Sequence, residues 1–532
     1  MSDLLSIGSS GVRAYQSALN VVGENIANAT TKGYARRDPT LIEQTGGAGR
    51  QILYSANQIG QGVAFTGVGR QWDDFRAAEV RTSASEAGRT NSTIVWLDRI
   101  EKALSGASIG GALTKFFNAA EGVAADPTGI APRTAMLDAA GGVAAAFTTT
   151  ANGLATIESD LQASAEIAVR QFNNFAAGLA EANAGLARVR AGSNEQAQLM
   201  DQRDRMIDSL SELGSVHVAM DDRGIATVRL NDSGGAILVQ GAEAKTLKVD
   251  FNASGTMALT LDPHLNPTPV AIRGGSIAGF AEAGARLSDT RAQVRDLAQA
   301  VADGVNAVQA RGVDLDAQPG GDIFDAGAGD GSLALAAIGP RQIAAARPWT
   351  VSPATGNAGG GALVAATNGS PLAQTRITIS AGVLTATDPV TNNVIGSVAY
   401  TPGTSVTLAG LNLTVSGNPG NGDSFTVGAT AAGSRDNGNL QGFAALRTSG
   451  KFENQANDLV TANASALSAK KQVADAQGVI LEGAKAALDA RSGVNLDQEA
   501  VELMRFQQAY AATSRIIQVA RDTFDSLLSA VT

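Results

Sequence analysis

The C-terminal segment, residues 493–532, has the most regular pattern of apolar positions in the chain. One apolar residue returns at every seventh position, and a second, mostly small or apolar series follows three residues behind it. The first series is Leu503, Tyr510, Ile517, Phe524 and Val531, and the second is Phe506, Thr513, Ala520 and Leu527. A repeat kept over four heptads is typical of a coiled-coil seam rather than the broader stripe of a core helix. From Leu496 to Val531 such a helix would be about 54 Å long, with Asn495 or Asp497 as its cap.

The N-terminal segment carries a similar pair of series. The leading positions are Leu5, Val12, Leu19 and Ile26, and the positions three residues behind them are Gly8, Tyr15, Val22 and Ala29. Two seams at opposite ends of one chain predict that the two ends come together as a pair of helices. The alternative is that each seam is a homodimerising coiled coil or an ordinary core helix.

Between the two ends, the period of the pattern changes several times. Residues 73–213 have helical periodicity, interrupted by Asp126-Pro127 and Ala131-Pro132, where we expect helices to end. Short β-type runs separated by turns occupy 216–272, helical periodicity returns from Gly274, and 350–432 alternates apolar residues with Thr, Ser or Asn. The last of these regions fits a two-layer antiparallel module.

The order helix, strand, helix, strand, helix predicts a multidomain α+β fold in which β domains are inserted into a helical stalk. Long terminal helices would form a coiled coil, and the stalk would be a helical bundle. The predicted boundaries are 1–45 with 495–532 for the terminal domain; 46–215, 273–332 and 433–494 for the stalk; and 216–272 with 333–432 for the β-rich outer domain or domains.

Composition narrows the class of protein. At 532 residues the chain is too long for one core, and aromatic residues make up only 4% of it, so small residues must fill the cores. The net charge of −10 argues against nucleic acid as a partner. The chain has no cysteine, which excludes disulfides and thiolate metal sites. No apolar run is long enough to span a bilayer, so no membrane insertion is expected. A cleavable secretory signal would be basic near its start, where this chain has Asp3, so we do not expect the N-terminus to be such a signal.

Residues suited to catalysis or metal binding are few. The two histidines, His217 and His264, are too far apart in sequence for a metal-ligand motif. The run Asp314-Leu315-Asp316 is superficially similar to a calcium loop, but Pro319 and Asp325 lie where that loop needs glycine and glutamate, which favours a turn. We therefore expect no enzymatic activity, no cofactor and no metal.

Four stretches resemble the rod, hook and junction proteins of the bacterial flagellum. Two of them lie near the ends of the chain, and the other two are internal. The N-terminal stretch is Gln16-Ser17-Ala18-Leu19 with Asn25-Ile26-Ala27-Asn28 and Thr31-Lys32-Gly33-Tyr34. The C-terminal stretch is Ser492–Asp497 with Arg505–Tyr510, and the internal ones are Gly312–Asp316 with Pro319–Asp322 and Gly422–Phe425. The chain departs from the usual family form at Lys32, where proline is common, and at Glu24, where asparagine is common.

The C-terminal and first internal stretches are most similar to the hook–filament junction subfamily. The resemblance implies a secreted protein that is exported unfolded by the flagellar type III apparatus and lies in the extracellular flagellum. It implies self-assembly into a short helical ring zone, with the hook protein, a second hook-associated junction protein and an export chaperone as partners. The chaperone is expected at the C-terminal helix.

The sequence thus predicts a structural adaptor that joins hook to filament through paired terminal helices. The predicted assembly interface is Leu5, Val12, Tyr15, Leu19, Val22, Ile26, Leu503, Phe506, Tyr510, Ile517, Phe524 and Leu527. One alternative is a hook or distal-rod structural protein, which shares the N-terminal motif. Another is a secreted adhesin or glycan-binding protein that functions through 333–432.

Overall fold

The computed structural model describes residues 2–44, 62–327, 329–367 and 374–531. The chain forms two compact units, one made of 1–97, 159–285 and 467–532, the other of 98–158 and 286–466. The predicted multidomain α+β fold class is confirmed, while the division into a terminal domain, a stalk and outer domains stays a prediction. Four helices contribute residues to both units, namely α2 (Asp74–Ala107), α4 (Ile130–Leu186), α6 (Gly275–Ala310) and α8 (Phe452–Ser492).

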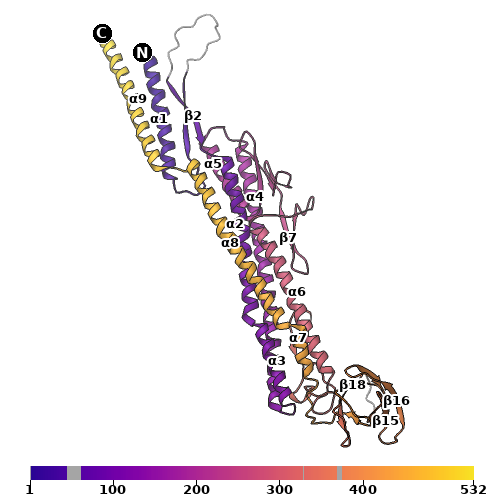
Figure 1. The fold of residues 1–532 in the computed structure, drawn as a ribbon. Coiled ribbons are helices and arrows are strands. Elements are labelled where there is room, and N and C mark those ends of the chain that lie inside the picture. The colour runs from indigo at the N-terminus through magenta and orange to yellow at the C-terminus, as the bar shows by residue number, and fades with distance from the viewer. Residues whose placement is uncertain (1, 45–61, 328, 368–373, 532) are drawn as a thin grey trace. The chain divides into compact units, whose positions relative to one another are not determined.

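In the first unit the two ends of the chain pair. Helix α1 (Ser2–Ala27) lies beside α9 (Leu496–Val531), and the N- and C-terminal ends are near one another (Figure 1). Strands β1 (Arg37–Glu43) and β2 (Val63–Arg70) form an antiparallel ribbon with a register shift after Thr40. The ribbon packs on α1 and on α5 (Asn194–Leu213).

The rest of the first unit is a helix-on-sheet core. Apolar residues of α4 and α5, including Phe172, Leu179 and Leu210, pack on strands whose residues alternate between the core and solvent. The side-chain amide of Asn183 bonds to the backbone N–H and C=O of Ala226, which satisfies these buried groups at the start of the central strand β4. The two antiparallel sheets are β3 (Val216–Met220), β4 (Ala226–Leu230), β5 (Ile237–Gln240) and β6 (Glu243–Ala244), and β7 (Leu247–Phe251), β8 (Met257–Leu261) and β9 (Thr268–Val270).

The second unit begins with helices. Ser108, with φ of 47°, separates α2 from α3 (Ile109–Ala125), and the chain breaks at Asp126-Pro127 as predicted. The second predicted break is wrong, because Pro132 lies in the first turn of α4, where its missing N–H removes no helical bond. Helix α7 (Gln441–Gly450) packs on α3 through the rings of Phe443 and Phe116, whose centroids are 6.1 Å apart.

Residues 349–429 form a β sandwich, which confirms the predicted two-layer antiparallel module. Its core includes Trp349, Ile377, Leu413 and Phe425. One sheet has the order β12 (Trp349–Pro353), β19 (Ser424–Ala429), β14 (Thr375–Ser380), β15 (Val383–Thr387) and β16 (Val394–Ala399); the other has β13 (Ala362–Thr367), β18 (Leu411–Ser416) and β17 (Ser405–Leu408). The segment before the sandwich holds β10 (Phe324–Asp325), β11 (Ala334–Leu335) and a short 3-10 helix (Pro340–Gln342).

The chain enters and leaves the sandwich at one place. The guanidinium of Arg347, just before β12, pairs with the carboxylate of Asp436, just after β19, with an N–O distance of 2.7 Å. The same carboxylate accepts a bond from the backbone N–H of Arg347, and the N–H of Thr430 donates to the carbonyl of Pro348. We call this pair of crossings, residues 347–348 and 430–436, the neck.

Candidate assembly site

The two terminal helices run antiparallel and approach closely through glycine. Gly8 lies against Ile517, Gly11 lies against Thr513, and the opposite end of the pair joins Asn25 to Glu499. A Cβ atom added at Gly11 would lie 2.5 Å from Cγ2 of Thr513. The absence of side chains at these positions therefore sets the distance between the helices.

The face of α1 that meets α9 has heptad spacing, but one of its two series is not the predicted one. The contact includes Gly8, Tyr15 and Val22, as the pattern predicts, together with Gly11, Ala18 and Asn25. The rings of Tyr15 and Phe506 lie 6.3 Å apart, and Phe506 is buried against Ala18 and Val22. The seam is therefore made largely of small residues around one aromatic pair.

The predicted series Leu5, Val12, Leu19 and Ile26 lies one position away from that face. Leu19 is partly buried beside the Phe506 cluster, but Leu5 and Ile26 are 43% and 37% exposed. The heptad spacing of large apolar side chains predicted the helix α1 correctly. It did not predict the face through which α1 contacts α9, because the two helices meet at glycine and alanine. The role of this series in assembly stays a prediction.

On α9 the predicted positions face α1 over the middle of the helix. Leu503 and Ile517 are partly buried, whereas Tyr510 lies at the margin of the contact. Phe524 and Leu527 are 51% and 50% exposed. Because Ile517 lies beside Gly8 in an antiparallel pair, the residues after about position 523 extend beyond Ser2, the start of α1.

A buried amide joins the end of α1 to the start of α9. The Nδ2 group of Asn25 donates to Oε2 of Glu499 at 2.9 Å and to the carbonyl of Arg37 at 2.8 Å. Its Oδ1 atom accepts from the N–H of Arg37 and from the hydroxyl of Tyr34. All four hydrogen-bonding positions of the Asn25 amide are filled, so its burial leaves no polar atom unsatisfied. These bonds fix the register of α1 against α9.

The second partner of Glu499 comes from the segment that follows α1. Nε of Arg36 donates to Oε1 of Glu499 at 2.6 Å, and the backbone N–H of Arg36 donates to the carbonyl of Ser492. Asn495 caps α9, since its Oδ1 accepts the N–H groups of Asp497 and Gln498. We refer to Asn25, Tyr34, Arg36 and Glu499 as the clamp.

The clamp continues into a row of carboxylates on α5. Asp201, Asp204 and Asp208 occupy one face of this helix, and arginines from three other elements reach them. Arg37 and Arg70 of the β1–β2 ribbon bind Asp201 at 3.0 and 2.7 Å. Asp204 receives Arg70, Arg81 of α2 and the neighbouring Arg203, while Asp208 receives Arg81 at 2.7 Å. These ion pairs tie α2, α5 and the ribbon together within the first unit, and Arg37 also pairs with Glu24 of α1.

Burial and the neighbouring arginines shift the pKa values of these carboxylates in opposite directions. Burial favours a raised pKa at Asp204, but Arg203, Arg70 and Arg81 outweigh it and hold that pKa below its usual value of 3.8. At Asp208 burial prevails over Arg81, so its pKa is raised. Burial also raises the pKa of Tyr34 to about 12, which keeps its hydroxyl a donor to Asn25 at neutral pH.

Catalytic and metal-binding groups do not gather in the parts of the chain described above. Within the described residues, no group of three or more histidine or acidic side chains could hold a metal ion. Asp314 forms the predicted turn, because its Oδ1 accepts the N–H groups of Asp316 and Gln318 at 2.8 Å. No helix among these residues has the length and apolarity that a membrane crossing requires.

Comparison with known proteins identifies the class. Residues 5–34 match the flagella basal body rod protein family, and residues 488–530 match the C-terminal family of the flagellar basal body rod FlgEFG proteins. These two matches cover most of α1 and most of α9, the pair that the clamp joins. The paired ends of the chain are thus similar in sequence to the corresponding segments of flagellar rod proteins.

The family match in the middle of the chain and the relatives that match over its full length indicate a narrower group of flagellar proteins. Residues 97–324 match the helical domain of the flagellar hook-associated protein FlgK. Flagellar hook-associated protein 1 of Salmonella typhimurium is 26% identical and that of Escherichia coli 27%, each over 99% of this chain and all of the relative. The hook junction protein FlgK of Burkholderia pseudomallei shares the fold, with a TM-score of 0.66 at 18% identity over 77% of this chain and 99% of that one. The chain is therefore similar to flagellar hook-associated protein 1 over nearly its whole length.

We expect Gly11→Ala to weaken the α1–α9 pair by about 1–3 kcal/mol, because the new methyl group meets Thr513. Gly23→Ala is the matched control: its Cβ meets nothing within 4 Å, so helix propensity should stabilise α1 by about 1 kcal/mol. Hydrogen exchange of the α9 amides measures both effects. Equal protection in the two variants would contradict the close approach at Gly11.

We expect Asp204→Asn to destabilise the first unit by about 3–5 kcal/mol, because three arginines lose a buried partner. In the native protein, the lowered pKa makes the contribution of Asp204 complete above pH 3.8 and progressively lost as the pH falls further. Denaturant unfolding between pH 6 and pH 2 should therefore show a loss of stability below pH 3.8 that is smaller in the variant. A pH dependence unchanged by the substitution would exclude this role.

Proposed function

We propose that the chain is a structural adaptor that joins the hook to the filament of the bacterial flagellum. The observation that carries the proposal is the pairing of the two ends of the chain, held in register by the buried Asn25–Glu499 contact. Such a pair presents both termini as one rod, so that copies can pack side by side through it. The full-length similarity to flagellar hook-associated protein 1 of other bacteria supports the same role.

Self-assembly would use the apolar side chains that the single chain leaves exposed. Leu5 and Ile26 on α1, with Phe524 and Leu527 on α9, are 37–51% exposed, and this exposed apolar surface would meet neighbouring copies in a short helical zone. The remaining predicted interface residues stabilise the pair itself. The outer domains would absorb the mechanical mismatch between a flexible hook and a stiffer filament.

The partners follow from this position. The hook protein would lie on one side of the zone and the second hook-associated junction protein on the other, outside the cell. The protein would reach this place through the flagellar type III export apparatus, unfolded, after release from an export chaperone bound at the C-terminal helix. The absence of cysteine and of long apolar runs is compatible with passage through a narrow channel.

The nearest rival is a hook or distal-rod structural protein, because the terminal matches are common to the whole class. The match of residues 97–324 to the hook-associated helical domain favours the junction. No cluster of aromatic or acidic side chains on the described part of the sandwich favours the adhesin alternative.

Deletion of the gene tests the position of the protein. We expect complete hooks without filaments, with flagellin released into the medium, because filament growth lacks its base. Electron microscopy of the cells and immunoblotting of the medium measure the two effects. Absent or truncated hooks would indicate a hook or rod protein, and normal filaments would reject a place in the axial structure.

Substitution within the helix pair tests the mechanism. Ile517→Asp should abolish filaments, because it places a carboxylate against Gly8 of α1, while the β sandwich stays folded. Leu265→Asp, at an 88% exposed position in the β8–β9 loop, is the control and should leave filaments normal. Complementation of the deletion strain and counting of filaments give the readout. Normal filaments with Ile517→Asp would count against assembly through this pair.

A further inference from the structure

The pair of helices α1 and α9 has a second apolar face beside the contact that joins it. In both helices one heptad series comes three residues before the series that makes the contact, which places it about 60° further round in the same sense. Because the helices are antiparallel, these two series lie on one side of the pair. We call this surface the second face; its residues are Leu5, Val12, Leu19 and Ile26 of α1 with Leu496, Leu503 and Tyr510 of α9.

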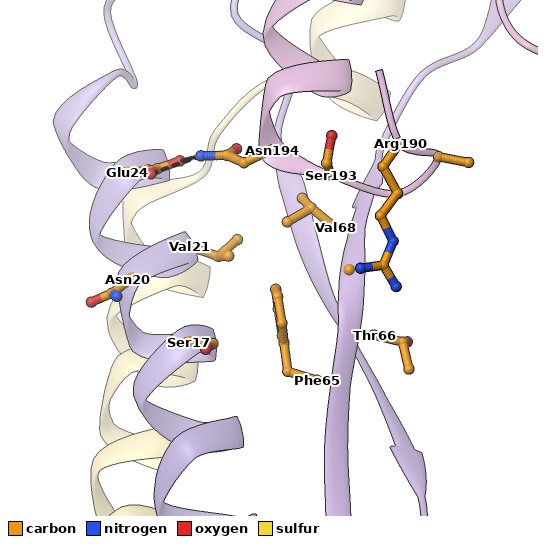
Figure 2. A pocket seen from close by; sticks show the side chains of 13 residues that line it. Ser17, Asn20, Val21, Glu24, Phe65, Thr66, Val68, Arg190, Ser193 and Asn194 are labelled. Atoms are coloured by element: carbon orange, nitrogen blue, oxygen red, sulfur yellow. Dashed lines mark hydrogen bonds between the residues drawn. The ribbon is translucent and has the colours of Figure 1, made fainter. Parts of the chain in front are cut away.

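The β1–β2 ribbon leaves the second face uncovered. Ser17 and Val21 of α1 are turned toward β2, where they line a cavity (Figure 2). Leu19 is two residues from each of them, about 160° round the helix, so it lies on the side away from the ribbon. The other members of its series share this heptad position. On α9, Leu496 and Tyr510 are 54% and 36% exposed.

The C-terminal half of α8 carries an exposed apolar stripe with the same period. The charged side chains of this half, such as Asp475 and Glu482, lie on another side of the helix. A Cβ atom added at Gly483 would meet nothing within 4 Å, so the space above the stripe is open. We call it the α8 stripe; its residues are Val473, Ile480 and Ala487 with Ala469, Ala476, Gly483 and Ala490, all exposed except the half-buried Ala487.

The α8 stripe and the second face match in length and in side-chain size. Each extends over about 21 residues of helix, or ~32 Å. When α8 is laid parallel to α9 with Gly483 opposite Tyr510, the smallest residue of the stripe meets the largest residue of the face. In the same register Ala476 lies opposite Leu503. Small residues thus face large ones, which is the arrangement that close packing of helices requires.

We propose that the second face receives the α8 stripe of a second copy of this chain. That α8 would lie parallel to α9 and antiparallel to α1, and Ile480 would pack beside Leu19 of α1. Because all three helices keep a heptad repeat, they would supercoil together with a left hand. The proposal rests on the proposed function, since it requires copies to be arranged in a zone, and it deepens that function by naming the two surfaces that meet.

The second face is continuous with the contact inside one chain. Leu19 and Leu503 already pack against the cluster around Phe506, so a third helix beside them extends an existing apolar core. Neither surface carries a charged side chain, so burying the two against each other leaves no charge unpaired. Exposed apolar surface that continues along a helix in this way is typical of an interface between protein chains.

The α8 stripe of the same chain cannot reach the second face. Helix α8 ends at Ser492, and α9 begins at Leu496 and continues in nearly the same direction (Figure 1). The middle of the stripe is therefore roughly 40 Å along the helix axis from the middle of the face. A copy displaced by that distance brings its α8 to the face in the parallel orientation. Because the two surfaces differ, the contact is head-to-tail and repeats from copy to copy, as a ring or helical zone requires.

Cysteine pairs test the contact directly, because the chain has no cysteine of its own. Copies carrying only Gly483→Cys and copies carrying only Tyr510→Cys are expressed together in the deletion strain, and isolated hook–filament complexes are treated with a mild oxidant. We expect a covalent dimer of the two variants. Gly478→Cys in place of Gly483→Cys is the matched control: its Cβ also meets nothing within 4 Å, but it lies on the far side of α8 from the stripe and should give at least a fivefold lower yield.

An exchange of side-chain size tests the register. Gly483→Leu should lower the number of filaments several-fold, because leucine would meet Tyr510, and Tyr510→Ala in the same chain should restore them. Gly478→Leu should leave filaments normal. Filaments that form normally without a cross-link, or an equal cross-link yield from Gly478→Cys, would overturn the docking and leave the adaptor function intact. If deletion of the gene left filaments in place, the adaptor function and the docking would both fail.

Discussion

The carboxylate of Glu499 is the group on which the arrangement of the chain ends depends. It is fully buried, and a buried charge without partners is strongly destabilising. Its two partners, Asn25 and Arg36, come from the far end of the sequence and satisfy it only when α1 and α9 have one register. The apolar contacts of the seam hold the helices together, while this carboxylate determines which residues face each other.

The acidic face of α5 extends the same constraint to the rest of the first unit. Arg37 bonds to Asn25 of the clamp through its backbone and to Asp201 through its side chain, so it connects the clamp to the ion-pair row. Glu24 pairs with Arg37 and accepts from Asn194, which adds a contact between α1 and the start of α5.

The sequence predicted those helices and strands in which large apolar side chains recur at regular spacing. The buried Phe506 on the contact face of α9, the cap at Asn495 and the short β strands between 216 and 272 are found as predicted. The contact face of α1 was misplaced, since glycine and alanine carry no hydrophobic signal although they determine how closely helices approach. The clamp was missed because the partners of Asn25 and Glu499 are set by tertiary contacts. The spacing of Asp201, Asp204 and Asp208 on one face of α5 was the available signal for the ion-pair row.

The neck has a consequence for how this protein can vary between bacteria. Because the chain enters and leaves the sandwich beside the single Arg347–Asp436 pair, sequence between these residues can lengthen, shorten or be exchanged without moving the helices on either side. The sandwich is thus free to diverge in sequence. The terminal helices, whose contact is fixed by Gly8, Gly11 and the Asn25–Glu499 hydrogen bond, have no such freedom.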